Sequence, residues 1–177
     1  MGEIRDEETA EISVNAALTG HLLFSTFHAN DAATAIPRLL KMGVEPFLLA
    51  STLELLVSQR LARKLCTNCR YSIETTRAQI EKKIKGAGKY IPEKCHIYEV
   101  KGCSACNNTG YVGRVGLFEF IKMTKDLKDL ILTSPSTGTI WDLAKKQGSQ
   151  TMLSDGIDKV RQGLTSLDEV SRVVSGD

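Results

Sequence analysis

The sequence predicts the later part of an α/β domain, then a small four-cysteine module and a helical C-terminal segment. Helical and strand-like patterns alternate over residues 1–65, two C-x-x-C pairs follow, and residues 120–177 are mostly apolar at helical spacing. The 177 residues suffice for one ordinary domain or a domain with a small appendix. Because 42% are hydrophobic and 25% charged, we exclude a disordered tail, a collagen-like repeat and a coiled-coil rod.

The first 65 residues form the predicted α/β part. Asp6 is a good N-cap and Gly20 a good stop, so a helix is expected between them. A short apolar run then favours a strand, and two helical patterns follow, of which Pro37 should shorten the first. The expected elements are a helix from Asp6 to Gly20, a strand at 21–26, and helices at 31–42 and 47–65.

Four cysteines have the spacing of a metal site. Two residues between thiolates allow both sulfurs to bind one tetrahedral ion, and two such pairs complete a structural zinc site. The pairs are separated by 33 residues, more than the usual 15 to 20 or so, so the intervening segment should carry structure of its own. The predicted zinc ligands are Cys66, Cys69, Cys103 and Cys106.

Two other interpretations of the cysteines were weighed. An odd total of five cysteines and no sign of secretion argue against disulfides. A redox role is weaker still, because there are two pairs and no thioredoxin-like βαβ context. The fifth cysteine, Cys95, is expected to be a small buried thiol.

The segments after residue 70 are expected to be mainly helical. Within the polar segment between the cysteine pairs, residues 76–85 have a helical pattern that ends at a Gly-Ala-Gly sequence. After the second pair we expect one strand at 115–121. Helices follow around Leu127–Ile131, Ile140–Ala144 and 152–162, and a last short one begins after Thr165.

Charge is concentrated in the middle of the chain. The segment Arg60–Lys101 carries a net charge of +7, although the whole chain carries only +2. Such a segment could face nucleic acid, acidic lipid or an acidic protein, or form an ordinary solvated surface. Nucleic acid is the weakest of these, because the only aromatic residues there are Tyr71, Tyr90 and Tyr98, without a stacking pattern.

No signal for export or membrane insertion is found. The longest apolar candidate, residues 47–57, falls short of the roughly 18 residues that a membrane helix needs. The N-terminus has no basic patch followed by an apolar run. We therefore expect a cytoplasmic protein.

Glu3 and His28 are the candidate residues for phosphate chemistry. Glu3 lies at the end of a predicted strand, where α/β sheets bind ligands, and could hold a magnesium-bound water or orient an attacking water. His28 lies in the turn after the next strand, so neighbouring strands would bring the two residues to one sheet edge. A solvent-exposed carboxylate and a loop histidine bonded to backbone are the ordinary alternatives.

Five stretches of the sequence resemble the secretion ATPase family, specifically type II secretion and type IV pilus assembly ATPases. The first two matching stretches look like the family's Walker B region and histidine box, and the next two like its tetracysteine module. Retraction ATPases of pili resemble the first forty residues but lack that module. The matching stretches are Gly2–Ala10, Ala17–Asp31, Gln59–Cys69, Gly102–Gly116 and Asp155–Val170.

The resemblance implies the C-terminal part of a RecA-like P-loop domain at 1–65, a tetracysteine module at 66–119 and a helical subdomain at 120–177. It assigns Glu3 to the Walker B acid, His28 to the γ-phosphate and Arg5 to charge compensation or packing. It further implies ATP, Mg²⁺, structural Zn²⁺ and a homo-hexamer. The implied partners are an inner-membrane platform protein and cytoplasmic membrane-anchoring proteins, which would hold the ATPase at the inner membrane.

One departure from the family concerns the phosphate-binding loop. No G-x-x-x-x-G-K-[ST] sequence is present, and this loop normally cradles the phosphates. We therefore expect a C-terminal fragment of a longer ATPase that alone binds ATP weakly and hydrolyses it negligibly. The alternative is a non-catalytic, zinc-bearing adaptor that docks on a membrane-platform protein.

Overall fold

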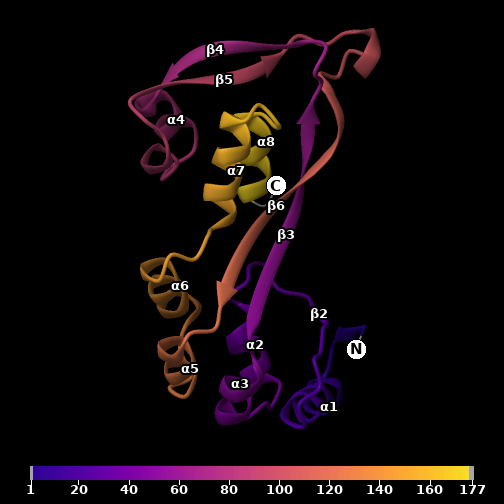
Figure 1. Ribbon diagram of the computed structural model, residues 1–177, viewed down its shortest axis with the longest axis vertical. Coiled ribbons are helices and arrows are strands. Elements are labelled where there is room, and N and C mark those ends of the chain that lie inside the picture. The colour runs from indigo at the N-terminus through magenta and orange to yellow at the C-terminus, as the bar shows by residue number, and fades with distance from the viewer. Residues whose placement is uncertain (1, 176–177) are drawn as a thin grey trace. The chain divides into compact units, whose positions relative to one another are not determined.

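The computed structural model describes residues 2–175 (Figure 1). These residues form two compact units, each built from two separate parts of the sequence. The first unit contains the residues up to Ser58 together with Glu119–Ser149, and the second contains Gln59–Phe118 and the residues from Gln150 onward. Two of the tail helices fold with the first unit and two with the second.

The first unit begins with two short parallel strands. Strand β1 (Glu3–Ile4) pairs with β2 (Thr26–Phe27), with Glu3 opposite Thr26. Between them lies helix α1 (Glu7–Leu18), which starts where the Asp6 carboxylate accepts the Thr9 N–H, as the N-cap prediction required. The predicted strand at 21–26 was too long: β1 offers only two residues for pairing, and residues 21–25 are not in a strand.

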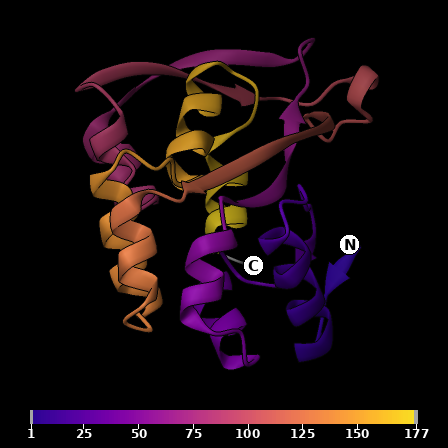
Figure 2. The ribbon, with the colours of Figure 1, turned by 60° about the horizontal axis from the view of Figure 1, so that its bottom comes forward.

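Short helices form the remainder of the first unit. They are α2 (Ala35–Lys41), α3 (Pro46–Thr52), α5 (Lys125–Ile131) and α6 (Thr137–Lys146). Helix α3 packs against both α1 and α5, and its closeness to α1 is visible in Figures 1 and 2. The buried side chains come from both parts of the sequence and include Ile36, Leu49, Leu127, Ile131 and Ile140.

The expected long helix at 47–65 was wrong in its second half. Helix α3 ends at Thr52, and strand β3 (Leu55–Leu65) follows. Exposed and less exposed residues alternate from Leu55 to Arg60, the period of a strand. Strand β3 pairs with β6 (Tyr111–Lys122), which contains the expected strand at 115–121 and extends it at both ends.

The second unit contains the structured excursion between the cysteine pairs. Strands β4 (Arg70–Thr76) and β5 (Lys94–Val100) form an antiparallel hairpin that the sequence did not predict. Helix α4 (Arg77–Lys83) matches the helical pattern at 76–85, and Glu81 accepts the N–H groups of Gly86 and Gly88 where it ends. Two 3₁₀ turns complete this part, at Gly88–Tyr90 and Ser104–Cys106.

Two helices pack with the hairpin to form the second core. Helices α7 (Met152–Arg161) and α8 (Leu167–Ser175) lie where the sequence placed its last two helices. Gly163 ends the first with φ +69°, a conformation that favours glycine. A Cβ at this position would lie 2.7 Å from the Tyr98 ring of β5. The core includes Ile80, Ile97, Leu117, Ile157 and Val170.

Candidate functional site

Glu3 and His28 lie side by side at the edge of the β1–β2 pair. His28 Nε2 is 2.7 Å from Glu3 Oε1. Parallel pairing places them as diagonal neighbours, because Glu3, the first residue of β1, lies opposite Thr26 and His28 follows two residues after Thr26. The neighbouring strands therefore bring the acid and the imidazole into contact.

The environment of the Glu3 carboxylate is uneven. Its Oε1 is buried and, despite the close His28 ring, has no hydrogen bond of good geometry to the residues that the structure describes. Its Oε2 receives Arg5 Nε at 2.5 Å. The side chains of Arg5 and His28 are 75% and 86% exposed, whereas that of Glu3 is only 18% exposed. One carboxylate oxygen is thus shielded from solvent beside the His28 ring, whereas the other is paired with Arg5.

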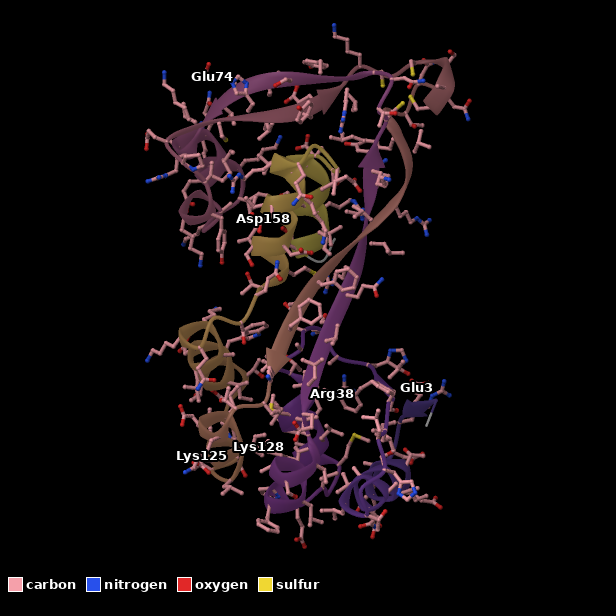
Figure 3. All side chains as sticks on the ribbon, viewed as in Figure 1. Glu3, Arg38, Glu74, Lys125, Lys128 and Asp158 are labelled. Atoms are coloured by element: carbon pink, nitrogen blue, oxygen red, sulfur yellow. The ribbon has the colours of Figure 1, made fainter. Side chains whose placement is uncertain are left out.

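Arg38 is a site residue that sequence reasoning missed. From helix α2 its guanidinium donates to the main-chain oxygen of His28 and lies 5.1 Å from the centre of the Phe27 ring. It therefore fixes the backbone on which the imidazole is carried. Figure 3 labels Arg38 and Glu3 in the first unit. No local pattern marks Arg38, because its partner lies ten residues earlier in a turn.

The four predicted zinc ligands converge in the second unit. Their Sγ atoms all lie within 4.8 Å of one another. Three separations are 3.9, 3.9 and 3.7 Å, for Cys66–Cys103, Cys69–Cys106 and Cys103–Cys106. Four sulfurs at about 2.3 Å from a tetrahedral zinc ion would be about 3.8 Å apart. The spacing of the four sulfurs fits this ion.

The backbone around the sulfurs also suits a thiolate site. Burial acts to raise the pKa of the Cys106 thiol, but N–H groups of Cys103 and Gly110 outweigh it and lower this pKa to about 6. Gly110 has φ +79°, and a Cβ there would lie 2.4 Å from Val100, so the donor requires glycine. N–H donors to sulfur are the usual second layer of interactions around metal-bound cysteines.

A buried carboxylate joins β3 to the last helix. Glu169 is 1% exposed and pairs with Arg63 and Arg172, at 2.6 and 2.9 Å. It also accepts the Arg63 N–H, while Thr165 donates to the Arg63 carbonyl. Burial acts to raise the pKa of Glu169, but the bonds from Arg172 and Arg63 outweigh it and lower this pKa to about 2.

Glu169→Gln should therefore make the free energy of unfolding less sensitive to a fall in pH. The folded-state pKa of Glu169 lies below its ordinary 4.5, so its contribution is complete above pH 4.5 and is lost as pH falls toward 2. We expect the variant to be about 3 kcal/mol less stable at pH 7, with the gap narrowing at pH 3. Urea unfolding of wild type, Glu169→Gln and the exposed control Glu93→Gln measures this. A gap that stays constant with pH would contradict it, since thiolate protonation affects all three alike.

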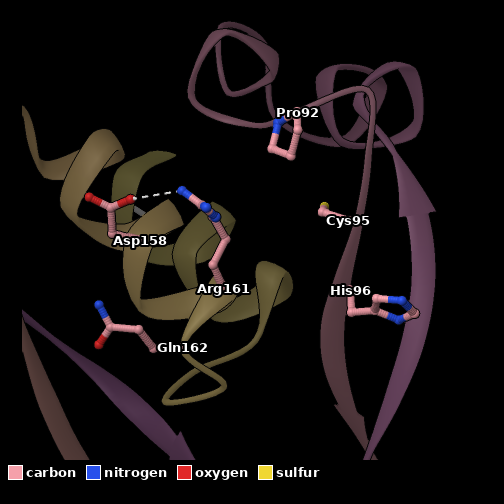
Figure 4. A pocket seen from close by; sticks show the side chains of 6 residues that line it. All are labelled: Pro92, Cys95, His96, Asp158, Arg161 and Gln162. Atoms are coloured by element: carbon pink, nitrogen blue, oxygen red, sulfur yellow. Dashed lines mark ion pairs between the residues drawn. The ribbon is translucent and has the colours of Figure 1, made fainter.

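Cys95 faces a hollow and is not fully buried, which corrects the sequence prediction. The hollow, about 460 Å³, lies between β5 and α7 in the second unit (Figure 4). Asp158 and Arg161 of the helix form an ion pair at its wall. Burial raises the pKa of the Cys95 thiol, which disfavours the reactive thiolate.

The sequence matches a known protein family. The family model of the type II/IV secretion system proteins matches residues 1–172. The chain belongs to this family. A type IV pilus assembly ATPase, PilB of Pseudomonas aeruginosa, is 43% identical over 98% of the chain, and the type II secretion system ATPase E of Vibrio cholerae is 42% identical over 98%. The chain spans 30% and 33% of these two secretion-family relatives.

Solved structures have a similar fold. The Legionella pneumophila ATPase DotB matches 99% of the chain and 38% of its own length with a TM-score of 0.62 at 20% identity. The pilus retraction motor PilT, solved with bound ADP, matches 96% of the chain and 37% of its own length with a TM-score of 0.60 at 24% identity. The chain thus shares the α/β fold of these ATPases. Among residues 2–175, no helix of this secretion-family chain has the length and apolar character needed to cross a membrane.

Proposed function

We propose that the chain supplies part of the ATP site of a hexameric ATPase that powers type II protein secretion or type IV pilus assembly. In this proposal residues 1–65 correspond to the C-terminal part of a RecA-like domain, 66–119 to a zinc module and 120–177 to a helical subdomain. Membership of the secretion family supports the proposal at the level of the family.

The observation that carries the proposal is the contact between Glu3 and His28. A carboxylate with one shielded oxygen and an exposed imidazole lie 2.7 Å apart, with Glu3 at the first residue of β1 and His28 directly after the last residue of β2. Ligands in α/β folds bind beyond the carboxyl ends of the strands, where His28 lies. A solvated carboxylate and an independent loop histidine would not need to converge there.

In the proposed site, Glu3 takes the place of the Walker B acid. Its shielded Oε1 suits a magnesium-bound water or the attacking water, and the exposed His28 ring can reach a terminal phosphate. Arg5 balances the second carboxylate oxygen. Magnesium, when bound, would neutralise charge on the phosphate oxygens.

The site is proposed to be incomplete within these 177 residues. Backbone amides and a lysine of a G-x-x-x-x-G-K-[ST] loop normally cradle the phosphates, and this sequence contains no such loop. The chain alone should therefore bind ATP weakly and hydrolyse it negligibly. The proposed surroundings are a homo-hexamer at the cytoplasmic face of the inner membrane, held by a platform protein and membrane-anchoring proteins.

The four cysteines are proposed to hold a structural zinc ion. Four thiolates leave no open position for water, so the ion would fix the fold and perform no chemistry. Its function would be to hold the β4–β5 hairpin rigidly beside the ends of β3 and β6, all of which meet near the cysteines.

A chimaera tests the proposal. This chain would replace the matching 173 residues of Pseudomonas aeruginosa PilB, which is 43% identical there. We expect magnesium-dependent ATP hydrolysis by the chimaera and none above background by the chain alone, measured as phosphate release. A folded, zinc-loaded chimaera without ATP hydrolysis would favour the adaptor alternative, and turnover by the isolated chain would contradict the incomplete site.

A further inference from the structure

A buried carboxylate outside the Glu3–His28 pair contacts the same turn. Glu119, on strand β6, is 5% exposed, and its Oε1 accepts the N–H of Ala32 at 2.7 Å. The two residues are 87 positions apart in sequence but lie in the same compact unit. Nothing in the proposed chemistry uses Glu119.

Ala32 belongs to the turn that carries His28. After β2 the chain passes through residues 28–34 before helix α2 begins. Asp31 accepts the N–H of Thr34 at 2.8 Å, which closes the end of the turn near the helix, and Ala32 and Ala33 are buried. The bond from Ala32 to Glu119 therefore ties the middle of the turn to a strand from a distant part of the chain.

The turn is thus held at two points, at His28 itself and four residues after it. Arg38 binds the main-chain oxygen of His28 at one end, and Glu119 binds Ala32 four residues later. His28 itself is 86% exposed, so packing of its own side chain does little to fix its direction. Its place beside Glu3 has to come from the backbone that carries it.

Burying a carboxylate in a protein interior has a large desolvation cost. Burying a charge is unfavourable unless hydrogen bonds compensate, whereas an apolar residue of similar size would pack without that cost. A carboxylate does provide a short, charge-assisted bond to a backbone N–H, about twice as strong as a neutral one. The 2.7 Å separation is in the range of such a bond.

We propose that Glu119 is a positioning residue that fixes the turn 28–34 and thereby holds His28 against Glu3. The catalytic meaning of this role rests on the proposed function, because it matters for turnover only if His28 faces a phosphate. The structural part stands on the contacts of the first unit alone.

Hydrogen exchange on the zinc-loaded chain tests the structural part. In Glu119→Ala the Ala32 amide should exchange at least tenfold faster, and nuclear Overhauser contacts between the His28 ring and the Glu3 side chain should weaken. Glu119→Gln retains an acceptor oxygen and should restore most of both signals. Glu54→Ala, which removes an exposed carboxylate bonded to Lys128 in the same unit, should change neither.

Amides of helix α5 distinguish positioning from general stability. If Glu119 positions the turn, exchange of Ala32 to Thr34 increases while α5 amides of the same unit keep their rates. Equal acceleration throughout the unit, or an unchanged Ala32 amide in Glu119→Ala, would overturn the proposal. In the chimaera, Glu119→Ala should lower kcat more than it changes KM and Glu119→Gln should recover kcat. If His28→Ala leaves kcat intact, the proposed function fails while the exchange result remains.

Discussion

Chelation of zinc from the reduced protein should unfold the second unit. Metal analysis of freshly purified chain should give one zinc per chain, and a strong chelator should abolish the cooperative unfolding of this unit. The expected effect is large, because apparent zinc-binding free energies in such sites are about 10 to 16 kcal/mol at pH 7 and appear as folding free energy. Circular dichroism and urea unfolding with and without chelator measure it.

The loss should extend beyond the cysteines to helices α7 and α8. Backbone hydrogen bonds join the segments around the two cysteine pairs to one another and to the rest of the unit. The Cys66 N–H donates to the Gly110 carbonyl, and the Leu65 N–H donates to the Leu164 carbonyl. Arg70, one residue after the first pair, donates to the Gly163 carbonyl at 2.6 Å. Without the ion the cysteine segments are no longer held together, so these hydrogen bonds to the segment between α7 and α8 should be lost as well.

Matched cysteine variants provide the control. Cys69→Ser removes a proposed ligand and should reproduce the chelator effect, whereas Cys95→Ser leaves all four ligands in place and should keep one zinc per chain. Protein purified under reducing conditions without zinc, yet unfolding cooperatively, would contradict a structural zinc site.

Replacing Glu3 by Gln in the PilB chimaera should lower kcat by about 10³-fold. Glutamine has nearly the same shape but no charge, so it can neither accept a proton from water nor attract a magnesium-bound water. A loss of this size equals about 4 kcal/mol of transition-state stabilisation. The measurement is steady-state phosphate release at saturating ATP and magnesium.

Glu7→Gln is the matched control for the Glu3 variant. Glu7 is an exposed acid in the first turn of α1, four residues from Glu3. Its variant should retain kcat within about twofold, since surface substitutions have small effects. Equal losses in both variants would indicate general damage to the segment, and an active Glu3→Gln chimaera would remove Glu3 from catalysis.

Local chemistry in the sequence predicted a large part of the first unit and the convergence of the candidate residues. Helix α1 follows from its Asp6 cap, and the four-cysteine cluster follows from the spacing of the two pairs. The convergence of Glu3 and His28 follows from one assumption, that consecutive strands are neighbours, and β1 and β2 do pair.

The sequence of strand β3 satisfies both the helical and the strand pattern, so a helix was predicted there. Val57, Leu61 and Leu65 recur every four residues, as on a helix face. What decides for a strand is pairing with β6, more than forty residues later in the chain. Local propensity does not contain that information.

Pairings between residues far apart in the sequence could not be predicted for the same reason. The β4–β5 hairpin pairs two short segments separated by α4, and the pairing between them is not contained in either segment alone. Glu119 and Ala32 are 87 residues apart, and the sequence around each residue does not predict the hydrogen bond between them. The grouping of α5 and α6 with the first unit also depends on contacts made across the sequence.

A crystal structure of the PilB chimaera with magnesium and a non-hydrolysable ATP analogue tests the central claim most directly. The account predicts that the Glu3 carboxylate and the His28 imidazole both lie within hydrogen-bond reach of the γ-phosphate, directly or through one water or the magnesium shell. If the nucleotide binds elsewhere, or if the two side chains turn to different sides of the first unit, the account is contradicted.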